Sequence, residues 1–261
     1  MCGISAIISL DDNLSNKNEI ILLHKNTKHR GPDSCNFVYL EKVHLAHHRL
    51  AIIDLKKESD QPFNFNNEIF IIFNGEIYNH VEIRNELIKK GIKFKTESDT
   101  EVILNSYRVW SEECINKFNG MWSFLIVDLR KNKIFCSRDR YGIKPFYYII
   151  YKKKVYIASE LKQFTNFGFA RNVNLEQASV YLYSGMTNTS NHTFFKNIFS
   201  LNPGENINID LNENTFAKNK WYFAKKNKTQ NNKYNLENLI NSVKLRLRSD
   251  VPLGCFLSGG V

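Results

Sequence analysis

Short runs of β-branched and aromatic residues, each bounded by polar turns, recur along the first 185 or so residues of the chain. Runs of this kind are typical of β-strands. The run at 68–73 (EIFIIF) is apolar almost throughout, which indicates a strand covered on both faces. We therefore expect strands at 4–10, 45–53, 68–73, 121–128, 133–137, 146–151 and 155–158.

Stretches with helical signals interrupt these strands, each opened by a capping side chain or closed by a glycine. They are 81–90, 100–109 and 175–184, with Asn79 and Asp99 before the first two and Gly91 and Gly185 behind the first and third. Because regular crossover helices do not separate the strands, mainly antiparallel sheets are expected. The expected packing is two layers of strands with helices on the outside, an α+β fold.

The character of the sequence changes after Gly185. Residues 225–235 are mostly Lys, Asn and Gln, which predicts an exposed connection. A helix with one apolar stripe is expected at 236–247. Phe256 and Leu257 then indicate a strand, followed by a glycine turn whose backbone N–H groups could hold a phosphate.

Composition excludes several classes of protein. No apolar run is long enough for a membrane span, and the N-terminus does not have the pattern of a secretory signal. The five cysteines are scattered, without metal-ligand spacing, so we expect reduced thiols, a cytoplasmic location and no metal site. The net charge of +10 is spread along the chain, which indicates solvated surface rather than a nucleic-acid groove.

Cys2 is the first candidate for catalysis. If an aminopeptidase removes Met1, one residue carries both a thiol and a free α-amino group. The amine has an ordinary pKa of about 8, so it can take the proton of the thiol without a separate histidine. Gly3 would let a substrate approach the backbone closely. A second-position cysteine is by itself more often an inert thiol, so the other motifs must decide.

Three further motifs suit the binding of an amide and an amino acid. Arg49 precedes an apolar run and offers a fork for a carboxylate. Asn74 and Gly75 follow the run at 68–73 and are either a turn or a pair of donors for an oxyanion. Asp99 is either a helix cap or an acceptor for an ammonium group.

Together the motifs of this chain resemble those of the glutamine-hydrolysing asparagine synthetases. The resemblance rests on their number, order and spacing over the whole chain. The motifs are MCGI at the start, RGPDS at 30–34, HRLAIID at 48–54, QPF at 61–63, FNGEIYNH at 73–80, ESDTEVIL at 97–104, FNGMWSF at 118–124, SRDRYGIKPFYY at 137–148, ASELK at 158–162 and DVPLGCFLSGG at 250–260.

The resemblance implies a class II glutamine amidotransferase domain at 2–186, a connecting segment at 187–235 and, at 236–261, the truncated start of an α/β ATP-pyrophosphatase domain. The first domain would be a four-layer αββα sandwich of the N-terminal-nucleophile hydrolases. The resemblance also implies site residues. Cys2 would be the nucleophile and Asn74 and Gly75 the oxyanion hole, Arg49, Glu76 and Asp99 would hold glutamine, and the backbone of Leu50, Ala51, Ile52 and Ile53 would line the pocket.

For the longer enzyme, the resemblance implies that Leu257, Ser258, Gly259 and Gly260 belong to an ATP loop. ATP, Mg²⁺ and L-aspartate would serve the synthesis of asparagine, and L-glutamine would supply the ammonia. We expect the present chain to be a fragment that hydrolyses glutamine without making asparagine. A homodimer is compatible with the resemblance, and no nucleic-acid or membrane partner is expected.

Two alternatives remain at this point. The chain could belong to a related amidotransferase that aminates another carboxylate, because the acceptor pocket would lie outside it. It could also be a folded module that binds glutamine and catalyses no reaction. Release of glutamate from glutamine, compared between the wild type and Cys2→Ala, separates the second alternative from an enzyme.

Overall fold

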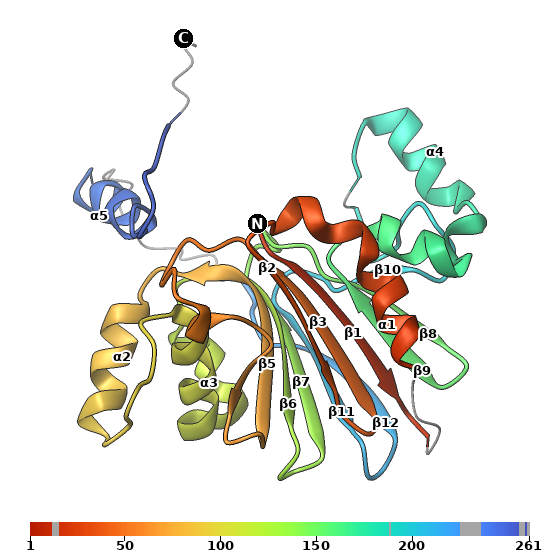
Figure 1. Cartoon of the computed structure of the whole chain (residues 1–261). Coiled ribbons are helices and arrows are strands. Elements are labelled where there is room, and N and C mark those ends of the chain that lie inside the picture. Colours follow the sequence, from red (N-terminus) through yellow and green to blue (C-terminus); the bar gives the residue numbers. More distant parts are fainter. Residues whose placement is uncertain (12–15, 188, 225–235, 256–258, 260–261) are drawn as a thin grey trace.

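The computed structural model describes residues 1–11, 16–187, 189–224, 236–255 and 259 of the chain. Two six-stranded sheets stack face to face, and helices cover their outer faces, so the core of the molecule has four layers (Figure 1). All the strand pairings within these sheets are antiparallel. The expected α+β, αββα sandwich with antiparallel sheets is therefore confirmed.

The first sheet carries the N-terminal strand near its centre. Helix α1 (Lys17–His24) and the 3-10 helix η4 (Leu161–Phe167) pack on its outer face. The strand order is β10 (Phe199–Ser200), β8 (Tyr147–Tyr151), β9 (Lys154–Ala158), β1 (Gly3–Ser9), β3 (Val43–Arg49) and β2 (Ser34–Tyr39).

The second sheet has its outer face covered by helices α2 (His80–Lys89) and α3 (Asp99–Trp110), which lie on the opposite side of the sandwich from α1 (Figure 1). Its strand order is β12 (Thr215–Lys220), β11 (Glu205–Asp210), β7 (Lys133–Arg138), β6 (Gly120–Asp128), β5 (Ile69–Ile77) and β4 (Phe63–Phe65).

Alternate side chains along each strand serve different layers, as the two-residue period of a strand requires. In β1, Ile4, Ala6 and Ile8 face the second sheet, whereas Ile7 packs outward against the α1 layer. In β5, Phe70 and Ile72 lie between the sheets, and Ile69 and Ile71 lie under α2 and α3. The expectation that the run at 68–73 is covered on both faces is confirmed.

The largest difference from the sequence-based strands is at the Asn74-Gly75 pair, which does not form a turn. Strand β5 continues to Ile77, and Asn74 and Gly75 pair with Ser123 and Trp122 of β6. A Cβ atom on Gly75 would lie 2.1 Å from the carbonyl oxygen of Met121. Here glycine allows close approach of two strands, and tertiary pairing overrides the local turn preference.

The expected helices agree with α2, α3 and α4 (Leu175–Ser184), and Gly185 ends α4 with a φ of 69°. Helix α1 and strand β2 were not predicted. The expected strand at 45–53 ends earlier, at Arg49. The expected strand at 256–257 and the expected exposed connection at 225–235 lie outside the described residues.

The sequence predicts a connecting segment over 187–235, but the structure places β10, β11 and β12 within it. Strand β11 pairs with β7, and its Ile207 and Ile209 enter the core between the sheets. Asn and Ile alternate at 206–209, which is the two-residue period of a strand. The prediction of a connecting segment relied on the polar composition and missed this alternation.

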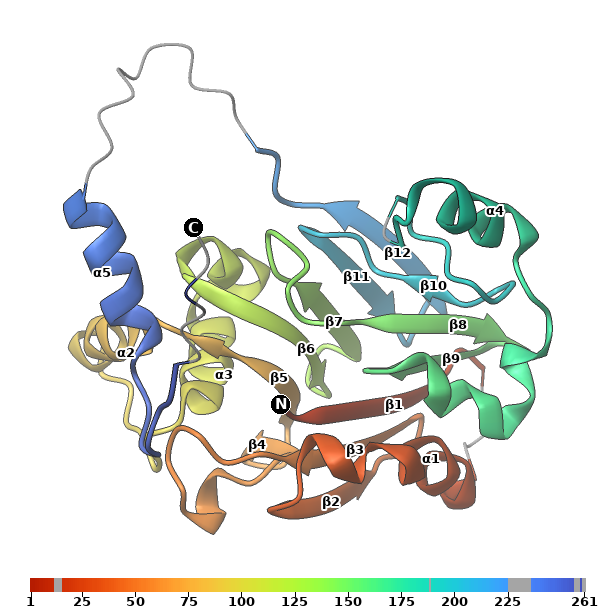
Figure 2. The same ribbon diagram turned by 90° about the horizontal axis from the view of Figure 1, so that it is seen from above.

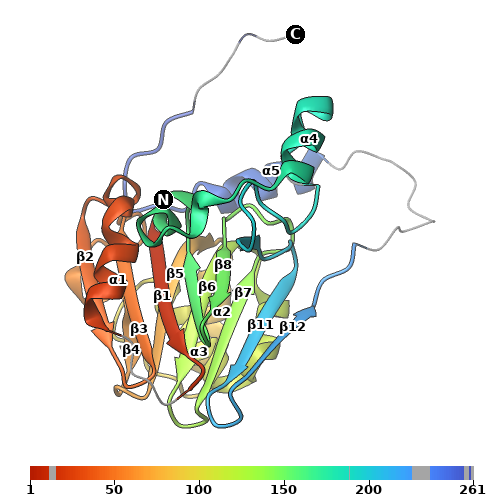
Figure 3. The ribbon, with the colours of Figure 1, turned by 90° about the vertical axis from the view of Figure 1, so that its right-hand side faces the viewer.

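Helix α5 (Leu236–Arg246) has no buried residue in the described structure. Its apolar stripe is exposed and comprises Leu236, Leu239, Val243 and, just beyond the helix, Leu247. Figure 3 shows α4, α5 and the N-terminus at the same end of the sandwich. No helix in the described part of the chain is both long and apolar enough to cross a membrane.

Candidate functional site

Strand periodicity brings the predicted polar residues to one end of the space between the sheets. Cys2 is two residues before the inward-facing Ile4, and Arg49 is four after Leu45. Asn74 and Glu76 are two and four residues after the inward-facing Ile72, so they lie on the same face of β5. Since β1 and β3 pair Gly3 with His48, Cys2 and Arg49 are also neighbours across the sheet. One alternating pattern therefore gathers side chains from β1, β3 and β5.

A pocket lies at this end of the sandwich. It is lined by Met1, Cys2, Arg49, Leu50, Ile52, Ile53, Gln61, Phe73, Asn74, Gly75, Glu76, Ser98, Asp99, Thr100 and Lys144. The structure thus brings together the residues predicted for catalysis and for glutamine, except that Ala51 lies beside the pocket and donates its N–H to Asp33 at 2.8 Å. Of the predicted ATP loop, Leu257, Ser258 and Gly260 lie outside the described residues, and Gly259 is exposed.

The Cys2 thiol lies against the start of the loop that follows β3. The Leu50 N–H donates to Cys2 Sγ at 3.4 Å, and Sγ lies 3.7 Å from the Leu50 carbonyl oxygen. Burial raises the pKa of the Cys2 thiol and lowers the pKa of the α-amine of Met1, which is still attached in this structure. Removal of Met1 would place the α-amine on Cys2 itself, beside the thiol, where it can accept a proton from sulfur.

Arg30 holds the backbone of Cys2 in place. Its Nε donates to the Cys2 carbonyl oxygen at 2.8 Å, and its Nη1 pairs with Glu160 at 2.9 Å. His29 and Lys162 also contact Glu160. The pKa of this carboxyl is lowered to about 2 because the hydrogen bonds from Arg30, Lys162 and His29 outweigh its burial. The motifs at 30–34 and 158–162 therefore support the nucleophile, a role that sequence reasoning did not identify.

The Asn74 side chain is buried, and neither its amide nitrogen nor its amide oxygen has a hydrogen-bond partner among the described residues. Leaving both groups unpaired is unfavourable, so this amide is suited to a polar ligand. In the same strand, Phe73 donates its N–H to Gln61 and Ile77 donates its N–H to Asp99. Alternate N–H groups of a strand point to the same side, so the Gly75 N–H lies between these two and faces the pocket.

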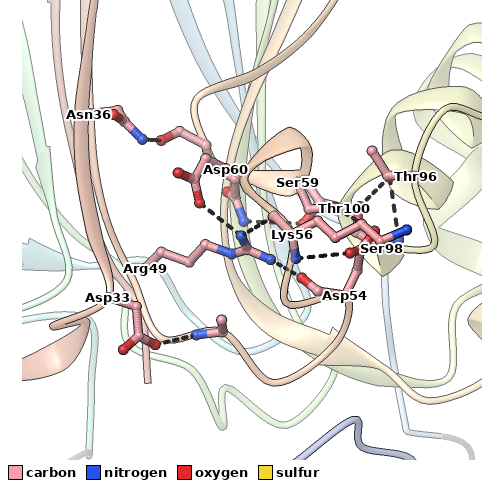
Figure 4. Close-up of polar contacts among 12 residues, drawn as sticks. Asp33, Asn36, Arg49, Asp54, Lys56, Ser59, Asp60, Thr96, Ser98 and Thr100 are labelled. Carbon is pink, nitrogen blue, oxygen red and sulfur yellow. Dashed lines mark hydrogen bonds and ion pairs between the residues drawn. The ribbon is translucent and has the colours of Figure 1, made fainter.

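Arg49 is engaged with its own loop, residues 50–60, in this structure (Figure 4). Its Nη1 donates to the Lys56 carbonyl and pairs with Asp60, each at 2.8 Å, and its Nη2 donates to the Ile53 and Asp54 carbonyls. The four N–H groups on the terminal nitrogens thus have protein acceptors, which leaves the Nε–H for a ligand. Sequence reasoning assigned the whole fork to a carboxylate and did not foresee that it organises this loop.

Two carboxyl groups face the pocket from the side of the second sheet. Burial raises the pKa of Asp99 to about 7, and the nearby Glu76 adds to the rise. Burial also raises the pKa of Glu76, although Lys144 and the N-terminal amine act in the opposite direction. The helix cap at this position is Ser98, whose side chain accepts from the Glu101 N–H. Asp99 is therefore not the capping residue and is available to the pocket.

Lys144 lines the pocket beside these groups and is 5% exposed. From the sequence alone, the densely charged turn at 138–145 is expected to be an architectural ion network. The structure corrects this, because the Asp139 carboxylate is bonded to backbone N–H groups, including those of Tyr141, Ile143 and Lys144. This turn directs Lys144 into the pocket. Burial lowers the pKa of Lys144, while Glu76 and Cys2 act in the opposite direction.

His24, Cys35 and His48 form a cluster on the outer face of the first sheet, with one potential ligand atom from each within 4.8 Å of the others. The two imidazole rings are stacked, with 13° between their planes and 4.1 Å between their centroids. A metal ion lies close to the plane of each imidazole that binds it, so stacked rings cannot both coordinate one ion. This cluster is not arranged as a metal site.

Comparison with known families gives matches over both parts of the chain. The family model described as a glutamine amidotransferase domain matches residues 1–222. The model described as asparagine synthase matches residues 236–261.

Curated relatives match the entire chain. A Methanocaldococcus jannaschii protein named as glutamine-hydrolysing asparagine synthetase 2 is 37% identical over 291 aligned residues, and asparagine synthetase 1 of Bacillus subtilis is 34% identical over 271. These alignments cover 100% of this chain but 55% and 42% of the two relatives. The chain thus spans about half the length of the curated relatives it matches.

A solved structure supports the fold. Glutamine phosphoribosylpyrophosphate amidotransferase from B. subtilis superimposes with a TM-score of 0.65 over 85% of this chain and 50% of that one. The sequence identity is 17%, so this likeness concerns the fold alone.

Proposed function

Because the chain belongs to the glutamine amidotransferase family and continues into the start of an asparagine synthase domain, we propose that it hydrolyses L-glutamine to glutamate and ammonia at Cys2. One observation carries the proposal. The Cys2 thiol shares a pocket with the unpartnered amide of Asn74 and the inward-facing N–H of Gly75. This is the pairing of a nucleophile with oxyanion donors that acyl transfer requires.

In the first step, Sγ of Cys2 attacks the side-chain carbonyl carbon of glutamine, and the α-amine freed by removal of Met1 accepts the thiol proton. Asn74 and Gly75 donate to the oxygen of the tetrahedral intermediate. The carbon–nitrogen bond then breaks, and the proton on the α-amine passes to the leaving nitrogen, which departs as ammonia. In the second step, the same amine takes a proton from water as the water oxygen attacks the thioester carbon. The carbon–sulfur bond then breaks, glutamate is released, and the proton on the amine returns to Sγ of Cys2.

The remaining pocket groups would hold the amino-acid end of glutamine. Arg49 presents its Nε–H, and the backbone of Leu50, Ile52 and Ile53 lines the wall beside it. Glu76 and Asp99 face the place of the ammonium group. Binding of that cation favours the charged form of both carboxyls, so it would lower their raised pKa values.

For the longer protein, we propose an ATP-dependent amidation of L-aspartate to asparagine, in which ATP would activate the carboxylate that ammonia attacks. The amidotransferase domain would start at residue 2 and extend beyond the expected end at 186 through β12, because β10, β11 and β12 belong to its two sheets, and the synthetase region would start at 236. Leu257, Ser258, Gly259 and Gly260 would contribute backbone N–H groups to ATP phosphates, with Mg²⁺ bound elsewhere. A cytoplasmic location, a homodimer and the absence of a nucleic-acid partner belong to the same proposal.

Glutamate release from glutamine tests the proposal, with Cys2→Ala as the matched variant. The wild type should release glutamate, and Cys2→Ala should release none above background. Intact mass should show loss of Met1 in the active preparation. Equal rates in the two proteins would remove Cys2 from the mechanism, and no turnover by the wild type, with Met1 absent, would exclude the glutaminase activity.

A further inference from the structure

The short segment behind α5, residues 248–250, bridges the chain just after β5 and the 50–60 loop. Arg248 donates to the Tyr78 carbonyl oxygen at 2.6 Å and pairs with Glu82 at 2.6 Å. Tyr78 follows directly on the strand that carries Asn74 and Glu76. In Figure 2 the dark blue chain behind α5 runs from the α2 side of the fold towards the orange loop between β3 and β4.

Asp250 contacts the 50–60 loop, whose first residues line the pocket. The Asp250 N–H donates to the Ile52 carbonyl oxygen at 2.9 Å, and the Asp250 carboxylate accepts the Asp54 N–H at 2.6 Å. Ile52 itself lines the pocket. The contact therefore spans 196 positions of sequence and joins the region matched by the asparagine synthase model to the wall of the glutamine pocket.

The part of the loop held by Asp250 needs such contacts to keep its conformation. Asp54 has a φ of 54°, in the left-handed region that residues other than glycine rarely adopt. Its carboxylate accepts from Ser59 Oγ and from the Glu97 N–H, each at 2.7 Å. Its carbonyl oxygen accepts from Arg49. Asp250 supplies the remaining backbone contact, on the N–H of Asp54.

This turn also positions the groups that touch substrate. Arg49 is oriented by the Ile53, Asp54 and Lys56 carbonyls, so a change at Asp54 changes the direction of the Arg49 guanidinium. At the start of the loop, Leu50 donates to the Cys2 thiol. A contact on Asp54 therefore acts mainly on the carboxylate end of the pocket, at a distance from the oxyanion donors of β5.

We propose that Asp250 is a positioning residue, which holds the 50–60 loop in its glutamine-binding conformation and so makes glutamine affinity depend on the segment that begins the synthetase region. The inference rests on the proposed glutaminase function. Asp250 touches neither glutamine nor Cys2. Displacement of the segment would release Asp54 and Ile52 and weaken the binding of glutamine. Docking of the segment on the loop would restore that affinity.

Three variants test the proposal in the full chain. Asp250→Ala removes the acceptor for the Asp54 N–H, Asp250→Asn keeps an acceptor oxygen of the same shape, and Lys244→Ala on exposed α5 is the matched control. We expect Asp250→Ala to raise KM for glutamine about tenfold with kcat nearly unchanged, because a charge-assisted hydrogen bond that supports binding is lost. Asp250→Asn should recover most of the loss, and Lys244→Ala should resemble the wild type.

Hydrogen exchange of peptides covering 50–60 supplies a readout that does not need catalysis. Faster exchange in Asp250→Ala, with slow exchange in Asp250→Asn and in the control, supports the contact. If hydrogen exchange at 50–60 is unchanged in Asp250→Ala, the contact does not hold the loop. If exchange is faster but KM for glutamine is unchanged, Asp250 does not position the loop for glutamine. If the wild type does not hydrolyse glutamine, the proposed function fails separately, and the exchange and a calorimetric titration with glutamine still decide the role of Asp250.

Discussion

Replacement of Asp99 by asparagine should stabilise the folded chain at neutral pH and weaken its binding of glutamine. Asp99 is 6% exposed and accepts the Ile77 N–H at 3.0 Å. Burial raises its pKa from 3.8 to about 7, with Glu76 nearby acting in the same direction. The folded protein therefore keeps a proton on Asp99 at pH values where the unfolded chain has already released it.

The sign and the size of the effect follow from this difference. Between pH 3.8 and about 7 the folded state binds more protons than the unfolded state, so the free energy of unfolding falls as the pH rises. The fall approaches about 1.4 kcal/mol per pH unit within this window and ends above it. Between pH 5 and pH 8, Asp99 should thus remove about 2.5 kcal/mol of stability from the wild type, and Asp99→Asn should not show this loss.

Urea denaturation of both proteins at pH 5, 6, 7 and 8 measures the difference. The stability of Asp99→Asn relative to the wild type should rise across the series and level off above pH 7, while other titrating groups cancel in the comparison. In glutamate-release assays, the same variant should raise KM about thirtyfold, because the ammonium of glutamine loses a charged partner. Parallel pH profiles for the two proteins would refute the assignment of a raised pKa to Asp99.

Three further substitutions test other parts of the site. Asn74→Ala should lower kcat about 10²- to 10³-fold in the glutamate-release assay through loss of an oxyanion donor, and an unchanged kcat would contradict that role. Arg49→Lys should raise KM for glutamine and lower the free energy of unfolding, measured by urea denaturation, by about 2 kcal/mol. Lysine cannot replace a guanidinium fork that binds loop carbonyls and Asp60 together, and wild-type values of both quantities would contradict this role. Gly75→Ala should destabilise the chain by about 2 kcal/mol or more in thermal denaturation, since its Cβ would meet the Met121 carbonyl oxygen at 2.1 Å; an unchanged melting temperature would show that β5 and β6 separate easily.

Much of the fold could be predicted because its local and its tertiary preferences agree. The strands of the core are apolar and short, and their ends coincide with polar turns, so β6 and β7 agree with the expected strands to within a residue at each end. Helix α4 begins at the expected Leu175 and ends where Gly185 predicts. Strands β11 and β12 were missed because their residues are mostly polar and become strands by pairing with β7 and with each other.

At the candidate site, sequence patterns identified the residues that carry chemistry but not those that support them. Arg30 and Glu160 were overlooked because an arginine and a glutamate 130 residues apart give no local signal that they meet behind Cys2. Lys144 was assigned to a structural turn because its place in the pocket depends on the buried Asp139 and on the approach of β5. Asn74 and Gly75 fit a turn equally well until the pairing of β5 with β6 is known.

The alternation of apolar and polar residues is written in the sequence, and it predicts the antiparallel sandwich and the side of each strand on which Cys2, Arg49 and Asn74 lie. How these residues behave once they are brought together depends on the packing of distant segments. Burial between the sheets raises the pKa of Asp99, the loop acceptors occupy the fork of Arg49, and Asp250 reaches the pocket wall across 196 positions of sequence. Strand periodicity is a local property, whereas desolvation, nearby charges and hydrogen-bond partners are set by which distant segments pack together.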